Sequence, residues 1–254
     1  MPRSFQVIAS AAIIALCAVP ARGIPEIQLS AAAQSHSPEH VDPEPVSLSS
    51  PVDAAVSIDA PRDEMLRGAA GQWQHWTAAP ALVVVTSVMQ YDADARGQYL
   101  ATSEMLSASD TGALVADLTD ALQLLTNGVF DRFNSVEFES VPSGNSVAIV
   151  RPKQIVVGRY RGLQEVARTL GFGGRKAAPN GAIISGAILL DHEFDRTSAD
   201  RRLLRTHELG HALGYNHVTS RTSIMNPRIG PRMTDSDLEI VRFAFNRLPS
   251  PSTN

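Results

Sequence analysis

The chain is nearly devoid of cysteine. Of its 254 residues only Cys17 is a cysteine, and it lies in an apolar stretch near the N-terminus. We expect this stretch to be removed as a leader, which would leave a chain without thiols and therefore without disulfide bonds. A lipid anchor on Cys17 is disfavoured, because an anchored cysteine follows a small residue and Leu16 is large.

Long apolar runs are missing as well. Residues 7–19 form an apolar core of 13 residues, shorter than the roughly 20 that cross a bilayer. Arg3 precedes this core, and the small residues Ala21 and Gly23 follow it, as is typical of a secretory signal peptide. We therefore predict a signal peptide over residues 1–23, a secreted or periplasmic location and no stable membrane span.

The chain also lacks an excess of basic residues. Lysine and arginine number 22 against 26 acidic residues, for a net charge of −4. Residues 24–76 carry eight acidic and two basic residues, whereas residues 77–254 carry 18 of each sign. Nothing in this balance favours nucleic acid or an anionic membrane surface as a partner.

Residues 24–76 are rich in alanine, serine and proline and show no sustained apolar period. Such a composition predicts a disordered acidic linker, with a propeptide as the alternative. Trp73 and Trp76, at its end, are expected to form an anchoring hydrophobic contact rather than a shelf for substrate. Residues 77–254 then suffice for one domain.

The most informative segment is residues 207–217, with the sequence HELGHALGYNH. On a helix, residues four apart lie about 40° apart around the axis, so His207 and His211 share one face and can bind one zinc ion. Glu208 lies about 60° round the helix from His211, close enough to reach a water on the metal without becoming a ligand. This is the position of a general base.

His217 needs a break in that helix. Six residues beyond His211, a continued helix would point it about 240° away from the metal. Gly214 is where the chain can turn back, because glycine adopts the left-handed conformation that ends helices. Three neutral imidazoles would then leave the fourth tetrahedral position of zinc for water, as in a catalytic site.

The eleven residues resemble the metzincin signature, and the segment around Met225 resembles the methionine turn that lies beneath the metal in those zinc endopeptidases. Pro227, in the form Met-x-Pro, makes the chain most similar to the matrixins (peptidase family M10). Val218 departs from the serine or threonine that matrixins usually carry after the third histidine. The cysteine switch of matrixin propeptides is excluded, because the only cysteine lies in the predicted leader.

The resemblance implies an α+β fold: a small metzincin-like domain with a twisted mixed sheet, an active-site helix and a C-terminal helix. Leucines at helical spacing predict a helix over residues 110–125, capped by Ser109 or Asp110. Thr197 or Ser198 is expected to cap the zinc helix, and Thr234 to begin the last one. Alternating or β-branched runs predict strands at residues 81–86, 136–141, 146–150, 154–160 and 181–191.

It also implies a function: a secreted zinc-dependent metalloendopeptidase that hydrolyses peptide bonds through a zinc-bound water, with Glu208 as general base. Its partner would be a protein or peptide substrate, extended along a sheet edge for which residues 181–190 are the candidate. Two alternatives stay open. One is a zinc-stabilised binding protein without turnover, and the other is hydrolysis of a non-protein or cell-wall amide.

A second ion is left open. The run Asp191–Asp195 is rich in carboxylates and is similar to the calcium and second-zinc loops of matrixins, but its spacing does not match those loops closely. A solvated turn is the favoured interpretation, with calcium only weakly supported. The sequence does not predict the oligomeric state.

Overall fold

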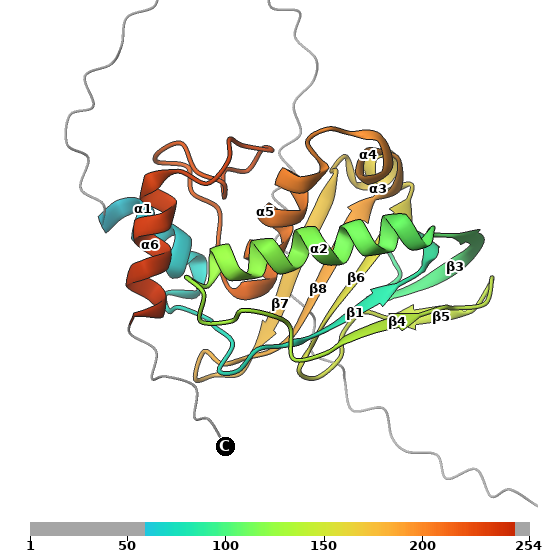
Figure 1. Cartoon of the computed structure of the whole chain (residues 1–254), viewed down its shortest axis with the longest axis horizontal. Helices are drawn as coiled ribbons and strands as arrows, with labels where there is room; N and C mark the ends of the chain where they lie inside the picture. Colours follow the sequence, from blue (N-terminus) through green and yellow to red (C-terminus); the bar gives the residue numbers. More distant parts are fainter. Residues whose placement is uncertain (1–58, 247–254) are drawn as a thin grey trace, which may run out of the picture.

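The computed structural model describes residues 59–246, which form a mixed eight-stranded sheet with helices packed against it (Figure 1). The predicted leader and most of the predicted linker lie outside these residues. The strands are β1 (Ala81–Val85), β2 (Ser87–Gln90), β3 (Gln98–Met105), β4 (Val136–Glu139), β5 (Ser146–Ala148), β6 (Gln154–Arg161), β7 (Gly171–Ala177) and β8 (Ile183–Asp191).

β6 is the centre of the sheet. On one side it pairs in parallel with β1, which pairs in parallel with β4, and on the other it pairs in parallel with β8. β7 pairs antiparallel with β8 and has no other partner among the described strands, so it forms an edge. The C-terminal end of β6 also pairs with β2, from which β3 and β5 extend the sheet in antiparallel fashion.

The central strands are buried on both faces, and alternate residues serve two cores. Leu82, Val84 and Ile155 face the helices, whereas Val83, Val85 and Val156 face a second core formed with β3 and β5. This two-sided burial explains why these strands read as continuous apolar runs. The α+β prediction is confirmed.

The helices are α1 (Asp59–Leu66), α2 (Ala108–Leu125), α3 (Leu163–Ala167), α4 (His192–Thr197), α5 (Arg201–Leu213) and α6 (Asp235–Phe245), with a 3₁₀ turn at Gly68–Ala70. α2 crosses one face of the sheet beside α5, and α1 lies against α6 at one end of the domain (Figure 1). No helix among residues 59–246 is long and apolar enough to cross a membrane.

The predicted helix starts are right in one case and wrong in two. Thr234 caps α6 in a reciprocal capping box with Asp237, as expected. α2 begins two residues earlier than predicted, because the Ser107 side chain accepts the backbone N–H of Asp110. The zinc helix α5 follows Asp200 rather than Thr197 or Ser198, since residues 192–197 form the separate helix α4.

The structure differs from the predicted linker at residues 59–76, here called the N-terminal segment. Met65, Leu66 and Trp76 are each 5% exposed or less and belong to the main core. The Trp76 indole N–H donates to the Ala212 carbonyl oxygen of α5 at 2.9 Å, so the expected anchoring contact is present. These few large side chains make the segment part of the domain despite its polar composition.

Candidate active site

Helix α5 carries the first two histidines of the motif, and both are buried. Their Nε2 atoms lie 3.1 Å apart. Two ligands on one helical face therefore meet at one point, as the spacing of four residues predicts. Every residue of α5 from Leu204 to Leu213 is buried, which fixes the helix between the sheet and α2.

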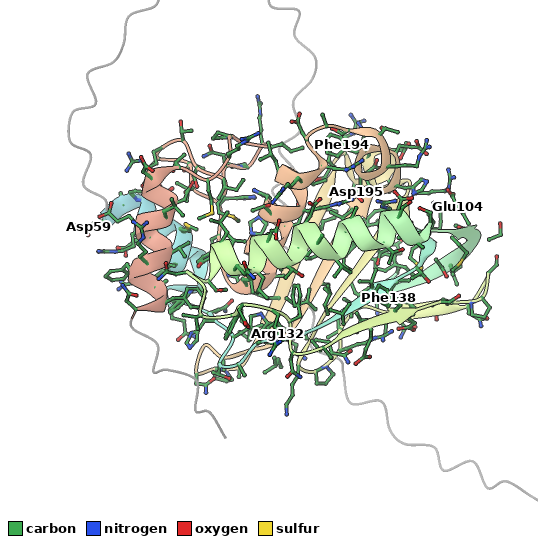
Figure 2. The ribbon with its side chains drawn as sticks, in the orientation of Figure 1. Asp59, Glu104, Arg132, Phe138, Phe194 and Asp195 are labelled. Carbon is green, nitrogen blue, oxygen red and sulfur yellow. The ribbon has the colours of Figure 1, made fainter. Side chains whose placement is uncertain are left out.

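Buried charges hold the N-terminal half of α5. Asp195 is fully buried and accepts hydrogen bonds from Arg159 Nε at 2.6 Å and from Arg205 Nε at 2.7 Å. Arg205 also donates to Asp117 of α2 at 2.7 Å. Asp195 is labelled above α2 in the view of Figure 2, and its network reaches α2 through Arg205 and Asp117, so that β6, α2, α4 and α5 are joined two residues before the first histidine.

α5 ends at Gly214, which has φ +118° in the left-handed region, as predicted. The reversal brings His217 back towards the helix, and its Nε2 lies 3.1 Å from His211 Nε2. A side chain at position 214 would overlap the carbonyl oxygen of Gln74, so the backbone of the N-terminal segment also requires a glycine here. We call residues 214–217 the third-ligand turn.

Backbone carbonyls orient the two helical imidazoles. His207 Nδ1 lies 2.7 Å from the Ile224 carbonyl oxygen, and His211 Nδ1 lies 2.9 Å from that of Tyr215. A carbonyl only accepts, so each Nδ1 carries the proton and each Nε2 presents a lone pair to its neighbours. The lone pairs of these two Nε2 atoms, 3.1 Å apart, repel one another unless a proton or a cation lies between them.

The donor set fits zinc. In a tetrahedral site with Zn–N distances near 2.0–2.1 Å, nitrogen ligands lie roughly 3.3 Å apart, close to the separations found here. The three histidines are the one group of metal-binding side chains detected within residues 59–246. Burial lowers the pKa of His207 to about 4 and holds those of His211 and His217 below the usual value, which keeps the ligands neutral.

Glu208 lies between α5 and the edge strand β7. It is 5% exposed, and burial raises the pKa of its carboxyl group to about 8, although a hydrogen bond from the Gly173 backbone opposes the rise. A Cβ at position 171 would lie 2.6 Å from Glu208 Oε1, and one at position 173 would overlap the Glu208 carbonyl oxygen. Glycines in β7 therefore allow the strand to approach the helix closely.

The segment around Met225 passes beneath the helix. Met225 is fully buried, and a Cβ at position 210 would lie 2.6 Å from its Sδ, which explains the glycine within the motif. Its carbonyl oxygen accepts the backbone N–H of Val218 at 2.9 Å, so the turn also supports the chain directly after His217. Pro227 follows as an exposed residue of the next bend.

Asp237 secures this turn from α6. Its carboxylate accepts from Ser223 Oγ at 2.5 Å and from the Ile224 backbone N–H at 3.0 Å. The Ile224 carbonyl in turn orients His207. The sequence predicts only a capping role for Asp237, because its second contact is made across the turn rather than within α6.

The carboxylate run Asp191–Asp195 does not form a metal cluster in the described structure. Asp191 caps α4 by accepting from the Phe194 backbone N–H at 2.9 Å, and Asp195 belongs to the buried arginine network. His192 Nε2 lies 3.1 Å from Glu104 Oε1. These carboxylates are thus engaged by other protein groups, and calcium gains no support from them.

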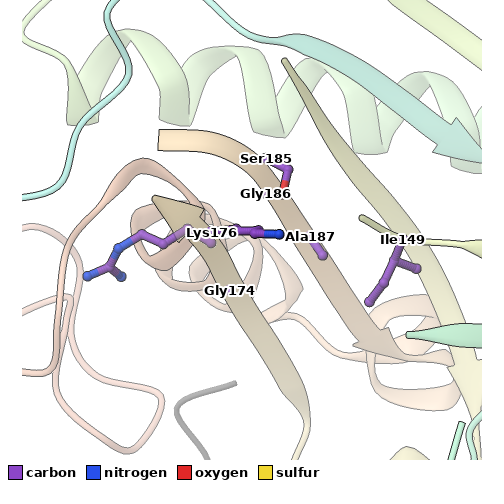
Figure 3. Close-up of a pocket in the computed structure, with 7 residues that line it drawn as sticks. Ile149, Gly174, Lys176, Ser185, Gly186 and Ala187 are labelled. Atoms are coloured by element: carbon purple, nitrogen blue, oxygen red, sulfur yellow. The ribbon is translucent and has the colours of Figure 1, made fainter. Parts of the chain in front are cut away.

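The edge of the sheet is not where the sequence predicts it. β8 is hydrogen-bonded on both sides, to β6 and β7, so residues 181–190 offer no free edge. The edge strand that packs against α5 is β7, whose sequence GFGGRKA has no apolar alternation and gives no strand signal. A shallow hollow beside β7 and β8, lined in part by Ile149 and Ala187, contains none of the three histidines (Figure 3).

The fold and the convergent histidines together define a metzincin-type zinc peptidase domain. The family comparison agrees: the matrixin model (Peptidase_M10) matches residues 75–241. The chain belongs to the matrixin family, whose members are zinc metallopeptidases. No curated protein sequence matches it significantly.

Proposed function

We propose that the chain is a secreted zinc metalloendopeptidase in which His207, His211 and His217 hold the metal and Glu208 is the general base. The observation that carries this proposal is the convergence of three neutral imidazoles beside a buried carboxyl group. An ion bound there would supply Lewis-acid chemistry, lowering the pKa of a bound water and polarising a carbonyl group.

Glu208 would move the proton. Its carboxylate takes a proton from the attacking water and returns it to the nitrogen of the leaving amine, so no covalent enzyme intermediate is needed. The raised pKa suits this double role, because the group can hold the proton between the two steps. A bound dication would favour the ionised form and bring the pKa back towards neutrality.

The substrate would lie along β7. Its free edge offers backbone N–H and C=O groups to an extended peptide, as in β-augmentation. Because β7 packs on α5 beside Glu208, a peptide paired with it would pass close to the general base and the three histidines. We therefore assign the substrate edge to residues 171–177 in place of residues 181–190.

Met225, Gly214 and Pro227 are proposed as structural support for the site. Met225 fills the space left by Gly210, and Gly214 lets the chain reverse towards His217. We also propose residues 1–23 as the export signal and place the start of the catalytic domain near residue 59 rather than residue 77. N-terminal sequencing of the exported protein would test the signal assignment.

The decisive experiment compares the purified exported protein with its Glu208→Gln variant. We expect both proteins to bind one zinc by elemental analysis, and cleavage of a mixed peptide library to fall by about 10²- to 10⁴-fold in the variant. Glu165→Gln, which alters an exposed glutamate of α3, is the matched control and should cleave normally. A wild-type protein that binds zinc but cleaves no better than Glu208→Gln would be a binding protein, and the proposal would fail.

A further inference from the structure

Arg175, on β7, makes an unusual set of contacts. Its Nε donates to Gln74 Oε1 at 2.7 Å, and one terminal nitrogen donates to Asn216 Oδ1 at 2.8 Å. The other terminal nitrogen donates to the carbonyl oxygens of His211 at 3.1 Å and Tyr215 at 3.2 Å. All four acceptors are neutral, and Arg175 takes part in no ion pair within residues 59–246.

An arginine without a carboxylate partner needs an explanation. Burial disfavours the charged guanidinium and lowers the pKa of Arg175 to about 10. Part of that cost is offset at the C-terminal end of α5, where unpaired carbonyl groups carry partial negative charge. Because the guanidinium is planar and rigid, its donors can bind several oxygen atoms in fixed positions at once.

These acceptors are connected to the histidines. The Tyr215 carbonyl that binds Arg175 also accepts from His211 Nδ1. Asn216 immediately precedes His217, and both its backbone N–H and its Nδ2 donate to the Met65 carbonyl oxygen, at 2.8 and 3.2 Å. One guanidinium therefore joins the end of α5, the third-ligand turn and the N-terminal segment.

We propose that Arg175 is a positioning residue for the metal: its guanidinium holds the third-ligand turn against the end of α5, so that His211 and His217 face the same ion. The inference rests on the proposed zinc function of the three histidines. Arg175 touches no reacting atom and acts through the backbone carbonyls of His211 and Tyr215 and through the side chain of Asn216. Removing partners of metal ligands typically costs about 10- to 100-fold in metal affinity.

The test measures the zinc affinity of the purified exported protein by competition with a chromophoric chelator. Arg175→Met keeps the length of the side chain but removes the charge and the donors, and we expect zinc to bind about 10- to 100-fold more weakly. Arg175→Lys should give an intermediate loss, because one ammonium group cannot span all four acceptors.

Lys176 supplies the matched control. It is the next residue of β7, so its side chain lies on the opposite face of the strand from that of Arg175, although both residues line the hollow of Figure 3. Lys176→Met removes the same charge from the same strand but no partner of a metal ligand. We therefore expect a loss of zinc affinity well below the roughly 10-fold minimum expected for Arg175→Met. An equal loss in both variants would show a general effect of charge and overturn the proposal.

Two further measurements separate positioning from stability. If Arg175 acts through Asn216, the effects of Arg175→Met and Asn216→Ala on zinc affinity should be strongly non-additive in the double variant. The visible spectrum of the Co²⁺-loaded Arg175→Met protein should also shift towards that of His217→Ala, because both displace the third ligand. Additive effects with an unchanged Co²⁺ spectrum would reduce Arg175 to an ordinary stabilising residue.

The outcome also distinguishes this inference from the proposed function. Zinc affinity and the Co²⁺ spectrum need no substrate, so a protein that binds zinc without cleaving peptides would contradict the peptidase activity and leave the role of Arg175 intact. A protein that cleaves peptides normally and binds zinc equally well with and without Arg175 would contradict the inference alone.

Discussion

His207 and His211 lie four residues apart on α5, where the helix itself sets their separation. His217 directly follows Asn216, whose side chain contacts Arg175 and Met65, 41 and 151 residues away in the sequence. The spacing of the first two ligands therefore depends on one buried helix, whereas the position of the third also depends on chain segments that are distant in the sequence. Substitutions can therefore disturb the two helical ligands and the turn ligand separately.

The largest effect is expected at the helix. Asp195→Ala would leave Arg159 and Arg205 without their shared buried carboxylate, at a cost of about 3–5 kcal/mol in the free energy of unfolding. Urea denaturation measures this loss. The exposed Glu193→Ala, on the same helix α4, should cost less than about 1 kcal/mol.

Zinc affinity then tests the comparison directly. In Asp195→Ala protein that is still folded, we expect wild-type affinity, because the separation of His207 and His211 is internal to the helix. If zinc affinity falls as far as in Arg175→Met, the two halves are not independent and the comparison fails.

As the pH falls, we expect His207, on the helix, to contribute more to the loss of stability than His217, on the turn. The pKa of His207 is lowered to about 4 in the folded protein, so its neutral form contributes stability above pH 6.5 that is lost as the pH falls towards 4. For His207 alone this amounts to about 3 kcal/mol. His217 is less buried, and its lowered pKa should contribute a smaller part.

The metal-free Glu208→Gln background is the place to measure this. The raised pKa of Glu208 has the opposite sign, since it favours the folded state as the pH falls from about 8 to 4.5, and the substitution removes it. Urea titrations between pH 7 and 4.5 should show that the free energy of unfolding depends less on pH in the His207→Gln variant than in the His217→Gln variant. Equal slopes would contradict the difference between the two ligands.

A smaller loss is expected where the edge strand meets the helix. Gly173→Ala places a Cβ onto the Glu208 carbonyl oxygen, so β7 must move away from α5, at a cost of about 1–3 kcal/mol. Because Arg175 lies on the same strand, we expect weaker zinc binding as well. Gly112→Ala, in α2, meets no atom within 4 Å and should be neutral or stabilising by up to about 1 kcal/mol.

The smallest effect concerns the loop after His217. Glu64 Oε2 accepts the backbone N–H groups of Thr219 at 2.7 Å and Ser220 at 3.2 Å. Glu64→Gln keeps one oxygen but loses the charge, which should cost about 1 kcal/mol and speed the release of zinc to a chelator. Asp63→Asn, on the same helix, is the control. If both variants release zinc at a similar rate, Glu64 does not stabilise the loop after His217.

Local signals predict the parts of the site that local structure makes. The helix through His211, its end at Gly214 and the capping box at Thr234 all follow from residues within one turn of each other. Two-sided burial made the central strands readable as apolar runs. The order in which these strands pair cannot be predicted from such runs, because it depends on contacts between distant segments.

The parts that were missed share one property. β7 is rich in glycine, which lets it pack closely against Glu208, and it therefore has no hydrophobic pattern that would predict a strand. The N-terminal segment is held by a few large side chains and by backbone carbonyls, and a carbonyl is present in every residue. Arg175 could be found only once its four acceptors were placed together in space.

The contact between Met65 and Asn216 spans 151 residues. During synthesis, the segment that supports the third ligand therefore leaves the ribosome long before the histidines do. The spacing of two imidazoles is set as soon as α5 forms, but the third also needs the N-terminal segment in place. A nascent chain that has not yet reached His217 accordingly lacks a complete metal site, however early its N-terminal segment has left the ribosome.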